Sequence, residues 1–402
     1  MGKIVDIKSR EKYYSNRDVI SLFSGAMGLD IGLTKAGLNV VIGQDFDKAC
    51  AETMRANGHD VLGGDIREIK PQDILDRTGL HIGEPFLICG GPPCQPFSTA
   101  GKRLGINDPR GSLFMDFIRM IDYIRPRFFI MENVKGIMSS PLKHVKSGER
   151  DENDPDQKLG TVLDVILSEF AKLGYKTVFG LLDAVNYGVP QFRERFVIVG
   201  SRDNEDIFLP IPTHFQMHQN PEYRWKTVGE AIKDLESDPG ECATFSEERK
   251  KYLRMVPEGG NWRNLPQNII PVAMGGAYES GGGKVGFYRR LSYDQPSPTV
   301  VTSPVQKATM MCHPTMDRPL SVKEYARIQQ FPDDWIFTGT TAAKYRQIGN
   351  AVPIGLAEAL GKAILSTADK TATVQTKRFR GTAVHTKIKE ALELGGLAYV
   401  SQ

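Results

Sequence analysis

The chain has 402 residues, of which 40% are hydrophobic and 25% charged, with a formal net charge of +3. This composition is typical of a soluble globular protein. It excludes a disulfide framework, because the five cysteines are scattered and odd in number. The nearly neutral charge neither indicates nor excludes a nucleic-acid binder, since a local basic groove is enough for phosphate contacts.

No apolar run reaches membrane-spanning length, and residues 1–6 lack an apolar signal region. We therefore expect a cytoplasmic protein that does not enter a membrane. No Cys/His spacing resembles a zinc site, so we expect no metal.

The first two hundred residues alternate short apolar runs with helical stretches, which is typical of βαβ units and a parallel sheet. The predicted strands lie at residues 19–23, 40–45, 85–89, 127–132 and 196–200, and a short helix at 29–36 ends at Gly37. We predict an α/β fold with a Rossmann-like sheet.

The rhythm changes further along the chain. Residues 139–158 form a polar insertion, and from about residue 201 Pro and Gly become frequent and the alternation stops. Helical patterns return at residues 321–330 and 354–364, and a basic patch lies at 377–380. We predict a catalytic and cofactor-binding domain at 1–200, completed by 316–366, an irregular domain at 201–315, and a tail at 367–402.

A Gly-rich turn at residues 23–28 follows the first strand, where a ligand can approach the backbone closely. Asp45 ends the second strand, where its side chain can accept hydrogen bonds from ribose hydroxyls. Phe46 can stack on an adenine ring, and Asp65 is suited to an adenine amino group. The alternative is that both aspartates are ordinary helix caps.

Residues 90–98, GGPPCQPFS, stop a buried strand abruptly and hold Cys94 at its carboxyl end. Open α/β sheets place their ligands at this edge, which favours a nucleophile. The alternative is a small buried hydrophobe, and we expect that of Cys50, Cys89 and Cys312.

Glu132 ends another buried strand, where burial would raise its pKa and let it donate a proton at neutral pH. Alternation places Gln191, Arg193 and Arg195 on one face, suited to phosphate or carbonyl oxygens. The alternatives are a satisfied structural glutamate and a solvated strand face. Later, Ser321 and Glu324 form a predicted capping box.

In this order and spacing, six segments resemble those of the DNA (cytosine-5)-methyltransferase family. They are the loop at 23–28, the PPCQ of 92–95, the ENV of 132–134, the QxRxR of 191–195, the helix segment at 318–332 and the GNAVP of 349–353. The resemblance covers about residues 17–365.

Two positions depart from the family pattern. Met27 stands where the family usually has glycine, so we expect a tighter loop that still binds the cofactor. Asp45 stands where the family often has glutamate. The insertion at 139–158 and the tail lie outside the shared pattern.

The resemblance implies transfer of a methyl group from S-adenosylmethionine to C5 of a cytosine flipped out of double-stranded DNA. Cys94 would attack C6, Glu132 would hydrogen-bond N3 and the exocyclic amine, Arg195 would contact the carbonyl, and Arg193 would steady the site or a phosphate. The cofactor-binding residues implied are Phe23, Ser24, Gly25, Gly28, Asp45, Phe46, Asp65, Ile66, Pro93, Leu113, Asn350 and Ala351.

The irregular domain would read the DNA sequence, and the loop at 96–110 would close over the flipped base. The DNA-binding residues implied are Gln95, Ser98, Lys102, Arg103, Arg289, Arg290 and Thr299. We expect a monomer of the restriction-modification or orphan type, in the first case with a cognate endonuclease. The alternatives are the branch of the family that methylates tRNA, a catalytically dead DNA-binding regulator, and a dehydrogenase.

Overall fold

The structure is a computed structural model that describes residues 17–93, 113–142, 151, 154–279, 285–371 and 399–400. An eight-stranded sheet forms its centre, in the order β3-β2-β1-β4-β5-β7-β6-β8. The strands are β1 (Asp18–Leu22), β2 (Asn39–Asp45), β3 (Val61–Gly63), β4 (Leu87–Gly90), β5 (Phe128–Asn133), β6 (Lys176–Asp183), β7 (Glu194–Ser201) and β8 (Tyr399–Val400).

The strands β1 to β5 run parallel, as predicted from the βαβ rhythm. Two strands run in the opposite direction: β7 is antiparallel to both β5 and β6, and β8 is antiparallel to β6. The strand β6 keeps the direction of β1 to β5, but both of its neighbours are antiparallel to it. The predicted α/β fold with a Rossmann-like sheet is confirmed, and this end of the sheet adds antiparallel pairs to the parallel strands. A helix precedes β6 and returns the chain to the sheet. The connection from β6 to β7 is too short for a helical crossover, so β7 runs antiparallel to β6.

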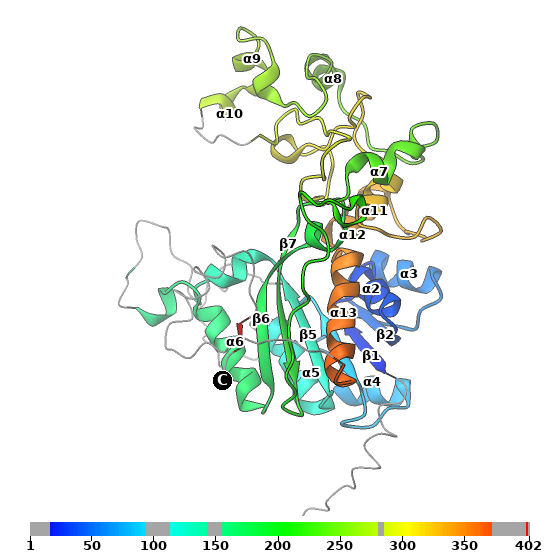
Figure 1. The fold of residues 1–402 in the computed structure, drawn as a ribbon, viewed down its shortest axis with the longest axis vertical. Helices are drawn as coiled ribbons and strands as arrows, with labels where there is room; N and C mark the ends of the chain where they lie inside the picture. The colour runs from blue at the N-terminus through cyan, green and yellow to red at the C-terminus, as the bar shows by residue number, and fades with distance from the viewer. Residues whose placement is uncertain are drawn as a thin grey trace, which may run out of the picture.

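Helices cover both faces of the sheet (Figure 1). They are α2 (Gly28–Lys35), α3 (Lys48–Ala56), α4 (Pro71–Thr78), α5 (Leu113–Ile124), α6 (Thr161–Lys172), α12 (Thr341–Asn350) and α13 (Ile354–Ala368). One core cluster joins the sheet to α4, α5 and α6, and a second joins the other face to α2 and α13.

The helices α2 and α13 pack closely although more than 300 residues separate them in the chain. A side-chain carbon on Gly32 would lie 2.4 Å from Cβ of Ala357, and one on Gly361 would lie 2.6 Å from Cβ of Ala36. The two glycines therefore set the distance between the helices. This contact brings the late segment of the chain back to the first strand.

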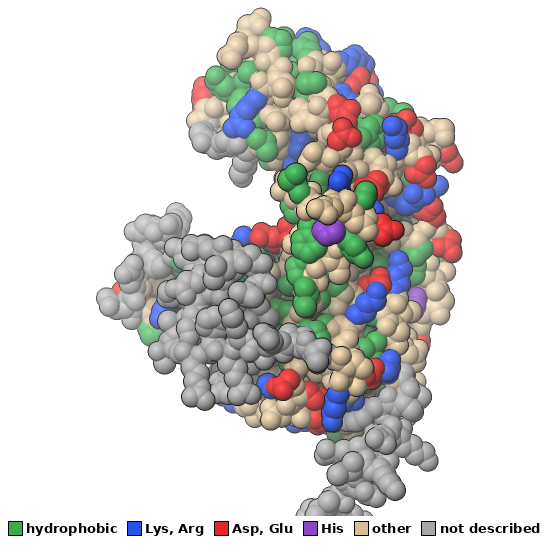
Figure 2. Space-filling view, viewed as in Figure 1, with side chains coloured by type: hydrophobic (Ala, Val, Ile, Leu, Met, Phe, Trp, Pro, Cys, Tyr) green, Lys and Arg blue, Asp and Glu red, His purple; other side chains and the backbone are tan. Residues whose placement is uncertain are grey.

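A smaller lobe stands above the carboxyl ends of the strands (Figure 1). Its short helices are α8 (Glu247–Leu253), α9 (Ile270–Met274) and α10 (Gly276–Glu279), and its own core runs from Phe245 to Cys312. The helices α7 (Val228–Ile232) and α11 (Val322–Ile328) share a separate cluster below it, which we call the neck. The space-filling view shows the molecule hollowed beneath the small lobe (Figure 2).

The small lobe begins later than the composition indicates. Ile207 and Leu209 pack in the same cluster as α13, on the sheet. The loss of βα alternation at residue 201 marks the end of the last long strand, but the chain still runs along the sheet before it leaves. The predicted boundary at 201 therefore precedes the lobe itself.

One helical stretch of the described residues, Thr341–Ala368, is long and apolar enough to cross a membrane, but 72% of its most apolar window is buried within the fold. The two helices that make up this stretch, α12 and α13, supply core residues to the neck and the sheet.

Candidate active site

A cavity of about 950 Å³ opens at the carboxyl ends of β1, β2, β4 and β5. It brings together most of the predicted site residues that the structure describes. These are Phe23, Ser24, Gly25, Asp45, Phe46, Asp65, Ile66, Pro93, Leu113, Glu132, Arg193, Arg195, Thr299, Asn350 and Ala351.

The predicted nucleophile, Cys94, lies outside the described residues. So do Gln95, Ser98, Lys102 and Arg103, which were predicted to contact DNA. The described turn that leads to them, residues 90–93, lines the cavity.

The loop after β1 turns sharply through left-handed backbone conformations at Phe23, Gly25 and Met27, with φ of 54°, 56° and 66°. No atom lies within 4 Å of the position where a Cβ of Gly25 would stand. The backbone therefore presents an open surface to the cavity at Gly25.

Gly28 has a different role from the one predicted. It does not line the cavity, and a Cβ at this position would lie 2.3 Å from the carbonyl oxygen of Val352. Glycine here lets the segment at 351–352 reach the loop, so Gly28 shapes the site by packing.

Asp45 holds the loop from the end of β2. One carboxylate oxygen accepts a hydrogen bond from the backbone N–H of Gly25 at 2.8 Å, and the other accepts one from Asp47 at 2.8 Å. Burial raises the pKa of Asp45. Each carboxylate oxygen has a second lone pair, so the side chain can still accept hydrogen bonds from a ligand in the cavity.

Two neighbours of Asp45 complete this part of the wall. Phe46 is 75% exposed, which leaves its ring free to stack on a planar ligand. Asp65 forms an ion pair with Arg67, and this hydrogen-bonded contact lowers the pKa of the Asp65 carboxyl. Sequence reasoning did not find Arg67, which follows Asp65 by two residues.

Glu132 and Arg195 form an ion pair within the cavity, with 2.6 Å between Oε1 of the glutamate and Nε of the arginine. Their side chains are only 12% and 11% exposed. Burial raises the pKa of Glu132, and Arg195 partly opposes that shift. A carboxyl group in this setting can supply a proton or a hydrogen bond to a base.

The turn before the predicted nucleophile is tied to this pair. A Cβ on Gly91 would lie 2.7 Å from Oε2 of Glu132, so only glycine lets the turn approach the carboxylate. Asn133 donates from Nδ2 to the carbonyl of Pro92 at 2.9 Å. Sequence reasoning did not assign a role to Asn133, although it follows Glu132 directly and alternation along β5 separates the two side chains.

Arg193 connects three segments behind the cavity. It is 2% exposed, and its guanidinium donates to the carbonyls of Val300 (2.7 Å), Gly349 (2.7 Å) and Ala351 (3.0 Å). These contacts suit the predicted steadying role. They leave little capacity for the alternative role of binding a phosphate.

The predicted DNA contacts in the irregular region have different settings. Thr299 is exposed at the cavity and donates to the carbonyl of Phe192 at 2.8 Å. Arg289 is partly buried and donates to the carbonyl of Met310 at 3.0 Å.

Arg290 is not available to DNA, and that prediction is wrong. It is 5% exposed, and all five of its N–H groups donate to protein acceptors. One acceptor is Asp317, at 2.6 Å. Arg290 therefore holds the small lobe to the segment that returns from it.

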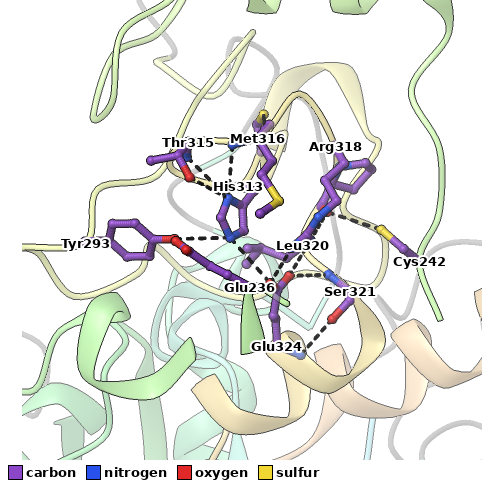
Figure 3. A network of polar contacts seen from close by, with 12 residues as sticks. Glu236, Cys242, Tyr293, His313, Thr315, Met316, Arg318, Leu320, Ser321 and Glu324 are labelled. Carbon is purple, nitrogen blue, oxygen red and sulfur yellow. Dashed lines mark hydrogen bonds and ion pairs between the residues drawn. The ribbon is translucent and has the colours of Figure 1, made fainter. Parts of the chain in front are cut away.

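A buried polar network lies in the neck (Figure 3). Glu324 accepts both 2.7 Å hydrogen bonds from Arg318 and one of 2.6 Å from the backbone N–H of Ser321, which confirms the predicted capping box. His313 is fully buried, with its Nε2 3.5 Å from Glu324. Its Nδ1 accepts the backbone N–H of Met316 at 3.1 Å, so this ring nitrogen carries no proton.

Within the described residues, no group of His, Cys, Asp or Glu is arranged to hold a metal ion. The cavity is lined by aromatic, carboxylate, guanidinium and backbone groups.

Comparison with known proteins adds independent information. The family model described as C-5 cytosine-specific DNA methylase matches residues 17–366. The chain is 41% identical over 355 residues to the type II methyltransferase M.PspPI of a Psychrobacter species, covering 86% of this chain and 78% of that protein. It is 38% identical over 370 residues to M.Sau96I of Staphylococcus aureus, covering 91% and 79%.

Solved structures share the fold. A putative DNA modification methyltransferase from an Escherichia coli prophage matches with a TM-score of 0.60 and 22% identity, covering 88% of this chain and 99% of that one. A DNMT2 variant from Spodoptera frugiperda matches with a TM-score of 0.54 and 19% identity, covering 87% and 99%.

Proposed function

This chain belongs to the C-5 cytosine-specific DNA methylase family and is a DNA (cytosine-5)-methyltransferase, and on that premise we propose how its residues perform the reaction. The single observation that carries the proposal is the shared cavity. The loop surface at Gly25 and Asp45 opens into the same space as the Glu132–Arg195 pair and the turn that leads to Cys94.

The cavity residues fit S-adenosylmethionine, which supplies an electrophilic methyl group when bound. The open backbone at Gly25 leaves room for a ligand. Asp45 would accept hydrogen bonds from the ribose hydroxyls, the exposed ring of Phe46 would stack on adenine, and Asp65 would meet the adenine amino group.

The protein groups would then act on the cytosine in sequence. The Cys94 thiolate adds to C6 and forms a covalent bond, which makes C5 nucleophilic. Glu132 hydrogen-bonds N3 and supports the charge that develops, while Arg195 contacts the carbonyl. After C5 is methylated, loss of its proton and elimination of Cys94 restore the ring. The base must be flipped out of the duplex for these steps.

We further propose that the protein is a modification enzyme acting as a monomer in the cytoplasm on one specific sequence in double-stranded DNA. The type II names of M.PspPI and M.Sau96I support this class. The small lobe, which has its own core, would read the sequence, and a cognate endonuclease would cut the same sequence.

The test is a bisulfite-type methylome of DNA from cells that express the protein, beside cells that express Cys94→Ser. We expect one recurrent sequence with a methylated cytosine in the first sample and none in the second. Methylated tRNA with unmethylated DNA would instead support the tRNA alternative. Methylation that survives in Cys94→Ser would refute the nucleophile assignment.

A second test addresses the cofactor site. Asp45→Ala removes the acceptor for ribose hydroxyls and for the N–H of Gly25, so we expect the affinity for S-adenosylmethionine to fall about 10- to 100-fold. Asp45→Glu keeps the carboxylate and should lose much less. Calorimetry measures both, and DNA binding should not change. Unchanged cofactor affinity in Asp45→Ala would rule out the ribose role.

A further inference from the structure

Asp30 is a carboxylate that the fold buries in the cavity wall without a partner. It lies in the first turn of α2 and is 1% exposed. Neither of its carboxylate oxygens has a hydrogen-bond partner of good geometry among the described residues, although the Ser21 hydroxyl and the N–H of Asp30 itself lie near enough to lower its pKa slightly. Together with its neighbours Ser21 and Leu29, Asp30 lines the same cavity as the predicted cofactor residues.

No positively charged side chain among the described residues acts on Asp30. Ser21 on β1 lies close enough to favour the ionised form, and Cys89 on β4 faces the carboxylate as a neutral thiol, because burial raises the pKa of Cys89. The one charged side chain of the described residues that acts on it is Asp45, which is also acidic. Burial, above all, raises the pKa of Asp30 to about 6, so the group remains mostly ionised at neutral pH.

A buried charge without a counter-ion is unfavourable, because it has lost its hydration and gained no partner. A positive charge on a bound ligand would offset this cost. The cofactor in the proposed function carries a sulfonium, an ammonium and a carboxylate group at its amino-acid end, so this end has a net positive charge. Ser21, Leu29 and Asp30 form one part of the cavity wall. If Asp45 binds the ribose, the amino-acid end of the cofactor is the portion that can reach this part of the wall.

We propose that Asp30 pairs with a positive charge on the amino-acid portion of S-adenosylmethionine and thereby selects a cationic ligand. The inference rests on the proposed use of that cofactor. It adds a carboxylate on α2 to a site whose other ligand groups come from the loop and from β2.

The test compares the wild-type protein with Asp30→Asn, which keeps the shape and removes the charge. We expect the affinity for S-adenosylmethionine, measured by calorimetry at pH 7.5, to fall about 10- to 100-fold. The melting temperature of the ligand-free variant should stay the same or rise, because an unpaired buried charge has been removed. Asp164→Asn, on the exposed surface of α6, is the matched control and should change neither quantity.

S-adenosylhomocysteine, which has the ammonium but no sulfonium, identifies the charge. An equal loss of affinity for both ligands assigns the pairing to the ammonium, and a loss for S-adenosylmethionine alone assigns it to the sulfonium. If the wild type binds S-adenosylmethionine and the variant binds it equally well, the role of Asp30 is overturned. If the wild type does not bind it at all, the proposed cofactor fails instead.

A second comparison covers the case in which Asp30→Asn does not fold. Asp30→Ser is smaller and also neutral, so the same loss is expected. In the wild type, affinity for S-adenosylmethionine should fall as the pH is lowered through about 6, since protonation removes the charge of Asp30. This fall should be shallower in the neutral variant, where only Asp45 and other carboxyls of the cavity titrate, and an identical fall in both proteins would overturn the inference.

Discussion

Met27 adopts a left-handed conformation, with φ of 66°, at the position where the resembled family usually has glycine. The expectation was a loop held tighter against the cofactor. Instead the Met27 side chain is fully buried against Ala51, Met54 and Val61, and it does not line the cavity. The methionine therefore adds core packing at the cost of about 1–2 kcal/mol of backbone strain.

The opposing effects of packing and backbone strain at Met27 predict an unusual order of stability among its variants. Met27→Ala keeps the strain and loses the packing, so it should destabilise the protein by about 2–5 kcal/mol. Met27→Gly loses the packing but relieves the strain, so it should be more stable than Met27→Ala by about 1 kcal/mol. Denaturant unfolding measures both. A less stable glycine variant would contradict the left-handed assignment.

Two pairs of arginines show how far the role of a single residue can be predicted from sequence. Alternation along the chain predicted that Arg193 and Arg195 share one face, because a strand has a fixed period, and both line the cavity. No local pattern distinguishes Arg289 from Arg290, yet Arg290 has five acceptors drawn from residues 23 to 37 positions away. Its role depends on folded neighbours and could not be predicted from residue type.

At the scale of elements, the neck joins α11 to the base of the small lobe through His313 and Glu324. Sequence predicted the capping box within α11, because its partners are three residues apart. It did not predict that His313, Tyr293 and Glu236 would meet there. Such contacts join distant segments and leave no periodic signal.

The neck should respond to acid. Burial lowers the pKa of His313 from 6.5 to about 4, although Glu324 opposes the shift. Between these values the unfolded chain binds a proton that the folded chain does not, so stability should fall as the pH is lowered from about 6.5 to about 4. Protonation would also place a proton on Nδ1, which accepts a backbone N–H in the fold.

The matched variant is His313→Asn, whose side-chain oxygen can accept the same N–H but cannot titrate. It should be less stable than the wild type at pH 7, and its further loss between pH 7 and pH 5 should be smaller. Urea unfolding at both pH values gives the comparison. Equal losses in the two proteins would show that His313 does not contribute to the acid sensitivity.

At the scale of the whole molecule, the parallel half of the sheet and the order of the motifs were predictable, because each βα unit has a local rhythm. The limits of the small lobe were not. Ile207 and Leu209 still pack on the sheet, and Asp317, beyond the predicted end at 315, pairs with Arg290 inside the lobe.

These contacts predict where a recognition unit can be exchanged. Replacing residues 236–317 with the matching part of a relative keeps Ile207 and Leu209 on the sheet and leaves both the Glu236–Tyr293 and Arg290–Asp317 contacts inside one unit. We expect a soluble enzyme with a new methylated sequence. Replacing 201–315 removes Ile207 and Leu209 from the sheet and separates Arg290 from Asp317, so it should give poorly soluble protein. A methylome that keeps the old sequence after the first exchange would place recognition elsewhere.

The close approach of Gly28 to the carbonyl of Val352 has a consequence for synthesis in the cell. The loop after β1 cannot pack against the segment at 351–352 until that segment, which is made more than 300 residues later, has left the ribosome. A growing chain can fold the early βα units, which contact one another locally. It should acquire the complete cavity only after residue 352 has emerged from the ribosome. A shorter nascent chain should therefore have no methyltransferase activity.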